Sequence, residues 1–173
     1  MSNDRNPMQR YAMLLGTYMG VFWILKFMLV PLGMTTSFLM MLFLGLTVCV
    51  PFMGYRYVRL YRDQVCGGHL SMGRAWVFTT LMYGYAALLT AIAHYVYFAW
   101  VDRGYMVETI EAVWDQAEAT GLQEVTTYSQ AVREALALVR LMTPVDIVMR
   151  LLWQNILYCA VLAIPIALFV QRK

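Results

Sequence analysis

Four long apolar runs constrain the fold of this chain more than any other feature. They cover about residues 11–32, 36–55, 72–100 and 144–170. Each has at least about 20 residues, and at about 1.5 Å per residue such a helix crosses the hydrocarbon core of a bilayer. Charged residues make up only 13% of the chain, whereas they make up about a quarter of a soluble protein. The sequence therefore predicts an all-α integral membrane protein with four transmembrane helices, and residues 1–173 form one membrane domain.

The segment between the third and fourth runs, about residues 103–142, has a different pattern. Two stretches place apolar residues at helical spacing with polar residues between them, and Gly121 separates the stretches as a helix stop. The apolar positions are Val107, Ile110, Val113, Trp114 and Ala117, then Val125, Tyr128, Val132, Leu136 and Val139. We predict an extramembrane amphipathic helical hairpin between spans three and four. It either packs as a cap on the end of the bundle or presents a face to a partner.

The basic residues are divided unevenly between the two sides of such a bundle. With both termini on one side, that side has eight Lys and Arg residues and two acids, and the opposite side has four Arg and eight acids. Cytoplasmic segments near span ends carry the excess of Lys and Arg. The pattern therefore predicts that the N-terminus and the C-terminus are both cytoplasmic and that the hairpin is outside.

The segment YRDQVCGGHLSMGRAW, at 61–76, contains a distinctive set of residues. It has the pair Arg62-Asp63, then Gly67-Gly68, and then Ser71, Gly73 and Ala75 at the start of the third run. With the acidic insert and a short basic C-terminus, this pattern resembles a family of uncharacterised small four-span proteins of the bacterial inner membrane, a domain of unknown function. The resemblance implies a multi-pass protein of the bacterial inner (cytoplasmic) membrane and implies no mechanism.

Four polar residues lie deep within the apolar runs: Lys26, His94, Gln154 and Asn155. Counted along the helices, they fall at a similar depth of about 9–16 Å from the outer surface. Ionisable groups inside a membrane are candidates for function, so these four form a candidate intramembrane polar cluster. The alternative is structural: a lysine can extend to the interface, and Gln and Asn often join neighbouring helices.

A second candidate site is the arginine-rich segment after the second run. Arg56, Arg59 and Arg62 are spaced by three, tyrosines alternate with them, and Arg74 follows the glycines. This suits an extension of span two into the interface, where guanidinium groups meet anionic lipid head groups. The segment either sets topology and anchors the protein in lipid, or binds a phosphorylated lipid or a cytosolic partner.

The sequence contains no recognisable catalytic motif, and its three cysteines have no metal-ligand spacing. We therefore predict no enzyme activity, catalytic residue, metal, cofactor or nucleic-acid partner. Partners are membrane lipids, with a membrane-protein partner or a second copy as further candidates. The favoured function is an accessory or interaction subunit, or scaffold, of a membrane complex. The alternative is a small oligomeric transporter or channel that uses the polar cluster, and a lipid-modifying enzyme ranks third.

Small residues are expected to mediate close contacts between the spans. The motif Gly16-x-x-x-Gly20 is of the type that lets membrane helices approach closely. Gly84 and several alanines of the third run are expected to pack in the same way. Spacing alone leaves open whether the motif packs within the chain or joins two copies.

Overall fold

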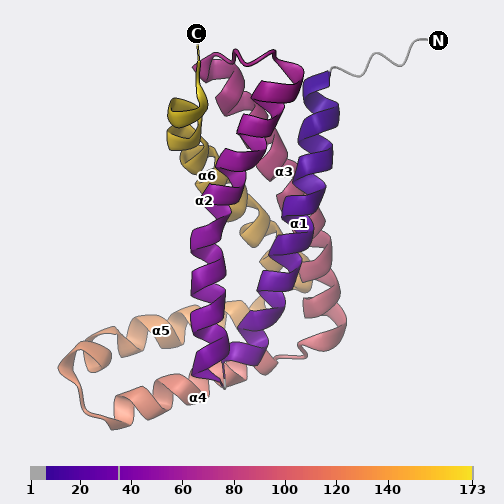
Figure 1. Cartoon of the computed structure of the whole chain (residues 1–173). Coiled ribbons are helices and arrows are strands. Elements are labelled where there is room, and N and C mark those ends of the chain that lie inside the picture. The colour runs from indigo at the N-terminus through magenta and orange to yellow at the C-terminus, as the bar shows by residue number, and fades with distance from the viewer. Residues whose placement is uncertain (1–6, 35, 173) are drawn as a thin grey trace. The chain divides into compact units, whose positions relative to one another are not determined.

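The computed structural model of this protein describes residues 7–34 and 36–172, and these form six α-helices (Figure 1). Asp4, Arg5 and Lys173, which enter the charge count, lie outside the described residues. The helices are α1 (Pro7–Gly33), α2 (Ser37–Val65), α3 (Met72–Val96), α4 (Tyr105–Ala119), α5 (Gln123–Leu141) and α6 (Pro144–Val170), and a π-helical turn, η1 (Tyr97–Val101), continues α3.

Four of these elements are long and apolar enough to cross a membrane: α1, α2, α3 with η1, and α6. The shorter helices α4 and α5 form a hairpin between spans three and four, so the predicted all-α architecture is confirmed. The bounds of α6 agree with the predicted run 144–170. By contrast, α2 continues ten residues beyond the predicted end at Tyr55, because the next helix-breaking residues are Gly67 and Gly68.

The chain divides into two compact units. One consists of Met1–Ala93 with Leu151–Lys173, and the other is His94–Arg150. A single membrane domain would require the two units to pack together. The single membrane domain therefore stays a prediction.

In the first unit, the glycine motif of α1 packs against α3. A Cβ placed on Gly16 would lie 2.6 Å from the carbonyl oxygen of Met82, and one on Gly20 would lie 3.2 Å from that of Ala86. The face of α1 that carries Gly16 and Gly20 is therefore used within the chain. Gly84 differs from the expectation, since no neighbouring atom lies within 4 Å of its Cβ position.

Aromatic residues fill the core of the first unit. The ring of Trp23 on α1 stacks on Tyr83 of α3 with centroids 5.8 Å apart, and Tyr61 of α2 stacks on Phe78 at 4.0 Å. Tyr83 is fully buried, and its hydroxyl donates to the carbonyl of Val50 at 3.4 Å. These contacts join α1, α2 and α3 through large side chains with defined orientations.

In the second unit, polar caps determine where the helices begin. The buried carboxylate of Asp102 accepts hydrogen bonds from the amides of Gly104 and Met106, at 3.1 and 3.0 Å, where α4 starts. The hydroxyl of Thr143 accepts from the amide of Asp146, and the Asp146 carboxylate accepts from the amide of Thr143. This reciprocal pair is a capping box at the start of α6. Gly121, with φ of 69°, follows α4 as the predicted stop.

Candidate functional site

The glycine loop after α2 is a helix stop built on Arg62. The amides of Cys66 and Gly68 both donate to the carbonyl of Arg62, at 3.2 and 3.0 Å. Gly67 and Gly68 have φ of 62° and 86°, in the left-handed region that favours glycine. The bond from Gly68 reaches back six positions, one more than the 6→1 bond of a Schellman motif. The Gly-Gly pair therefore serves to end α2 sharply.

The side chain of Arg62 joins this loop to the end of the chain. Arg62 is only 4% exposed, and its Nη1 donates to the carbonyl of Val170, the last residue of α6, at 2.9 Å. Its Nε donates to Asp63 Oδ1 at 2.8 Å. Next to it, Leu70 and Arg172 exchange two backbone hydrogen bonds of 3.0 Å each. The Arg62-Asp63 and Gly-Gly parts of the sequence motif thus form a structural connection between α2 and α6.

Arg62 differs in exposure from the other arginines of the segment that is predicted to bind lipid or a partner. Arg56, Arg59 and Arg74 are exposed, whereas Arg62 is buried and bonded to backbone. The bonds of Arg62 are those of a structural residue, and the prediction that this arginine segment meets a head group or a partner stays a prediction.

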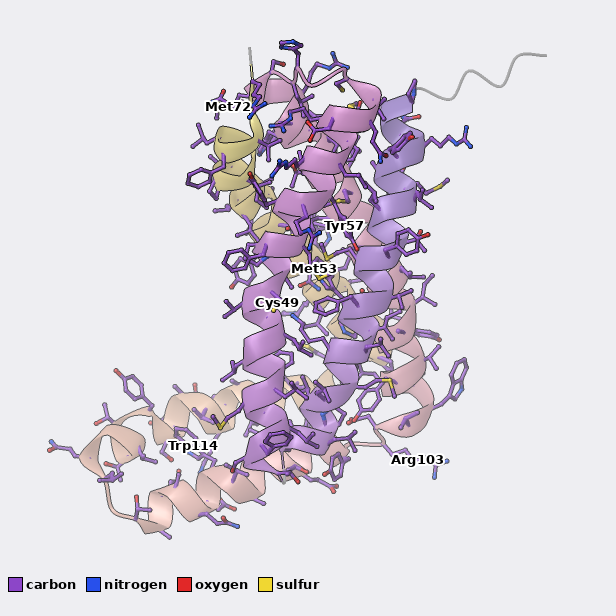
Figure 2. All side chains as sticks on the ribbon, viewed as in Figure 1. Cys49, Met53, Tyr57, Met72, Arg103 and Trp114 are labelled. Carbon is purple, nitrogen blue, oxygen red and sulfur yellow. The ribbon has the colours of Figure 1, made fainter. Side chains whose placement is uncertain are left out.

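Arg56 and Arg59 line a surface hollow of about 640 Å³ along α2. Cys49, Met53 and Tyr57 mark successive turns of this helix in Figure 2. The residues that line the hollow are Met53, Tyr55, Arg56, Tyr57, Arg59, Leu60, Asp63 and Gln64. Met53 thus lies at one end of the hollow, Asp63 and Gln64 lie at the other, and the two arginines lie between them.

The polar residues of the spans contact a variety of neighbours. Lys26 is half-buried, and its Nζ donates to the hydroxyl of Thr47 on α2 at 3.2 Å and lies 5.1 Å from the centre of the Phe43 ring. Gln154 is exposed and donates to the Tyr158 hydroxyl, one turn along α6. The contacts of Lys26 join α1 to α2, and the hydrogen bond of Gln154 lies within α6.

The two remaining members of the predicted cluster lie in different units. Asn155 is half-buried in the first unit. His94 belongs to the second unit, is buried, and has its ring edge-on to Phe98 at 6.5 Å. Among the described residues, no group of three His, Cys, Asp or Glu could hold a metal ion. The grouping of the four polar residues into one intramembrane site stays a prediction.

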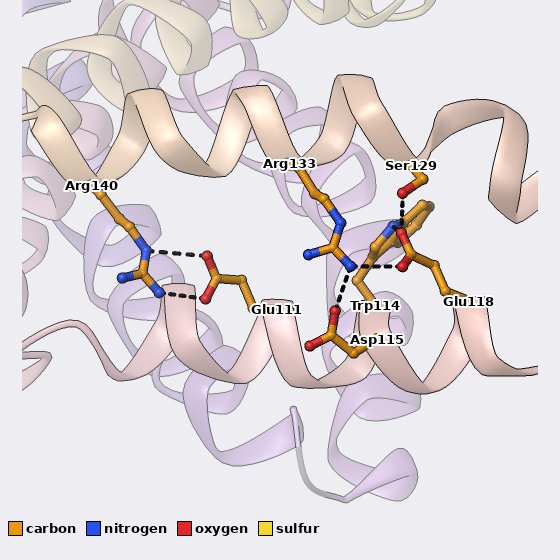
Figure 3. Close-up of polar contacts among 7 residues, drawn as sticks. All are labelled: Glu111, Trp114, Asp115, Glu118, Ser129, Arg133 and Arg140. Atoms are coloured by element: carbon orange, nitrogen blue, oxygen red, sulfur yellow. Dashed lines mark hydrogen bonds and ion pairs between the residues drawn. The ribbon is translucent and has the colours of Figure 1, made fainter.

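Charged side chains bridge α4 and α5 (Figure 3). The Nη2 atom of Arg133 lies 2.8 Å from Oδ1 of Asp115 and 2.7 Å from Oε2 of Glu118. The guanidinium of Arg140 donates two hydrogen bonds to the carboxylate of Glu111. Ser129 and the Trp114 indole also donate to Glu118. The bond to Arg133 is the main reason that the pKa of Glu118 is lowered, and the same pair raises the pKa of Arg133.

The apolar positions of the hairpin only partly follow the predicted stripes. Leu136 is buried and Val125, Val132 and Val139 are half-buried, as expected of an inner face. Tyr128, assigned by spacing to the same stripe, is exposed, and so are Ile110 and Val113 of α4. The inner face of the hairpin is therefore narrower than the predicted stripes, and it leaves these three residues outside the contact.

Sequence reasoning missed three structural positions. Asp102 caps α4, and an Asp shortly before a helix with glycine between is a signal that could have indicated it. Thr47 accepts from Lys26, and Gly54 leaves room for Tyr83. Nothing in the spacing of a single sequence marks these two positions, because each depends on how one helix is rotated against another.

The outward faces of the spans are covered with large apolar side chains such as Phe38, Phe52 and Phe169. Such surfaces are stable only in contact with lipid or another apolar surface. The four spans and these faces define a small multi-span helical membrane protein in contact with lipid.

The chain belongs to the family described as a protein of unknown function, DUF4199, whose family model matches residues 14–172. The match covers nearly the whole chain, including the glycine loop and the hairpin. Comparisons with curated proteins and with solved structures gave no match. Family membership therefore confirms the predicted resemblance and specifies no process.

Proposed function

We propose that this protein is a non-enzymatic interaction subunit of a membrane complex, and that the α4–α5 hairpin is its docking element. The observation that carries the proposal is that the hairpin leaves large apolar side chains exposed, although its inner face already covers Leu136 and its charges pair across the two helices at half-exposed positions. Apolar side chains that the hairpin does not cover need another apolar surface.

The exposed apolar residues of α5 follow one stripe. Tyr128, Ala131, Ala135 and Leu138 are all exposed and are spaced by three, four and three residues, which places them on one face of the helix. On α4, Ile110 and Val113 are exposed at the same kind of spacing. Apolar helix faces of this kind suit the groove of a protein partner.

The charge of the hairpin indicates what this face contacts. Residues 105–141 contain six acids and two arginines. An anionic lipid surface would repel this segment, and so would the hairpin of a second copy. The hairpin therefore suits a partner with an apolar groove bordered by Lys or Arg. The positive-inside pattern favours a partner reached from the extracytoplasmic side.

Co-purification from native membranes with a matched pair of variants tests the proposal. Leu138→Gln changes a residue of the stripe that is 59% exposed, and Leu122→Gln changes a residue off the stripe that is 61% exposed. After cross-linking and solubilisation, we expect Leu138→Gln to lose a stoichiometric partner that Leu122→Gln retains. A protein that is recovered only as free monomer, with or without these substitutions, would exclude the interaction role.

The transport alternative depends on the predicted polar cluster, whose one Lys or Arg residue is Lys26. Its contacts with Thr47 and Phe43 join α1 to α2 and account for its position without transport. Replacing Lys26, His94 and Asn155 together by Leu distinguishes the two functions. Transport requires the loss of the associated phenotype, whereas the interaction role predicts that the partner is still recovered.

A further inference from the structure

We infer that the hollow along α2 is a binding site for one anionic phospholipid, with Arg56 and Arg59 on its phosphate. This inference is independent of the proposed docking role, because the hollow lies on α2 in the first unit and the hairpin lies in the second. It concerns a specific site rather than the general attraction of a basic membrane protein to anionic lipid.

The lining of the hollow passes from Met53 at one end to Asp63 and Gln64 at the other. This order suits a phospholipid, which has apolar acyl chains at one end and a polar head group at the other. The lining extends from Met53 to Gln64, eleven helical steps of about 1.5 Å each, or about 16 Å in all. The Met53 end follows the apolar part of the span, and the Gln64 end lies next to the loop. A hollow of about 640 Å³ can hold a phosphorylated head group and the start of its acyl chains.

The walls of the hollow are held in place by the core. Met53, Tyr55 and Tyr57 are half-buried and pack against the buried cluster of the first unit. Arg62 lies one turn after Val58 on the buried side of α2. Its side chain is held there by the hydrogen bond to the carbonyl of Val170. The helix face that carries the hollow is therefore fixed by packing, and the exposed arginines extend from a rigid support.

The two arginines supply a phosphate-binding charge. Arg59 Nε lies 3.6 Å from Asp63 Oδ2, a distance at which Asp63 orients the guanidinium and leaves other N–H groups available. No ion pair is recorded for Arg56 among the described residues, so its guanidinium is available to a ligand. Two guanidinium groups about one turn apart can bind the oxygens of one phosphate, and the tyrosines suit the interfacial depth.

Lipid binding by the purified, delipidated protein tests this inference, with phosphatidylglycerol as the probe. The Arg56→Gln/Arg59→Gln variant removes both hollow arginines, and Arg10→Gln removes an exposed arginine of α1 that does not line the hollow. All three residues are exposed, so these variants are expected to fold. Native mass spectrometry or a thermal-shift titration gives the apparent affinity.

We expect the double variant to bind phosphatidylglycerol at least about tenfold more weakly, and Arg10→Gln to stay within about twofold of the unchanged protein. Phosphatidylcholine and glycerol 3-phosphate should bind weakly to all forms, the first for lack of net charge and the second for lack of acyl chains. Equal losses in the double variant and in Arg10→Gln would overturn the site. Glycerol 3-phosphate binding as tightly as the lipid would show a site for free phosphate compounds instead.

Discussion

The guanidinium of Arg62 donates to the carbonyl of Val170, a residue 108 positions later in the chain. The last carbonyls of a helix have no partner within that helix, and a cation near them is favourable. One side chain of α2 thus caps α6. The Leu70–Arg172 pair adds two backbone bonds beside it. The loop after α2 and the end of the chain therefore form one structural unit.

Replacing Arg62 should destabilise the protein far more than replacing its exposed neighbour. Arg62→Gln removes a buried, charge-assisted hydrogen bond to Val170, and we expect a loss of about 2 kcal/mol, or about 5 °C in thermal midpoint. Thermal unfolding in detergent measures the change. Arg59→Gln is the control, because Arg59 makes an exposed pair with Asp63, and its midpoint should change by less than about 1 °C. Equal shifts would contradict a capping role for Arg62.

The contact between α1 and α3 at Gly16 should not tolerate a methyl group. In Gly16→Ala the Cβ would lie 2.6 Å from the backbone oxygen of Met82, so one helix must shift, at a cost of about 2 kcal/mol. Gly84→Ala on α3 is the control, because its Cβ enters open space and alanine favours a helix. Its midpoint should stay the same or rise. If both variants have the same midpoint, the close approach at Gly16 is wrong.

Gly54 and Tyr83 should be energetically coupled. A Cβ on Gly54 would overlap with the Tyr83 hydroxyl and would lie 3.0 Å from its Cζ, and the stacking of Trp23 restricts movement of the ring. Gly54→Ala should therefore be destabilising alone and less so in combination with Tyr83→Phe, which removes the hydroxyl. A double-mutant cycle should show a coupling of about 1 kcal/mol. Strict additivity would show that the two residues do not meet.

The hairpin should loosen in acid. Because the bond to Arg133 lowers the pKa of Glu118 in the folded protein, the pair stabilises the hairpin above the ordinary carboxyl pKa of about 4.3. This stabilisation is lost as the pH falls through the lower pKa of the folded state. The raised pKa of Arg133 has no effect in this range, since the group stays protonated.

Hydrogen exchange of the amides of residues 105–141, corrected for the intrinsic rate, measures this acid response. Protection should decrease below about pH 4 in the unchanged protein. In Glu118→Gln it should be lower at neutral pH and should change less on acidification. An unchanged acid response in Glu118→Gln would assign it to other carboxylates, such as Glu111 beside Arg140.

The spans and the hairpin could be predicted because each depends on one property of the local sequence. Apolar length determines which segments can cross a bilayer, and Pro144 and Gly121 mark helix ends by their backbone preferences. The rotation of each helix about its axis could not be predicted. Arg59 and Arg62 are about 60° apart around α2, yet one is exposed and the other buried.

The same limit applies to the polar residues and to the hairpin. Depth along a helix could be counted for Lys26, but its bond to Thr47 depends on which face of α1 meets α2. Spacing placed Tyr128 with Val125 and Val132, but Tyr128 is exposed whereas the two valines are half-buried. Periodicity identifies an amphipathic helix, and the packing against the neighbouring helix decides which of its apolar residues are covered.

We propose above that the exposed stripe of the hairpin docks onto a protein partner. The most direct measurement is photo-cross-linking in native membranes with a photoreactive residue at Leu138 and, separately, at Leu122. We expect one abundant cross-linked protein, other than this chain, from position 138 and little or none from position 122. Cross-links only to lipid or only to a second copy from position 138 would contradict it.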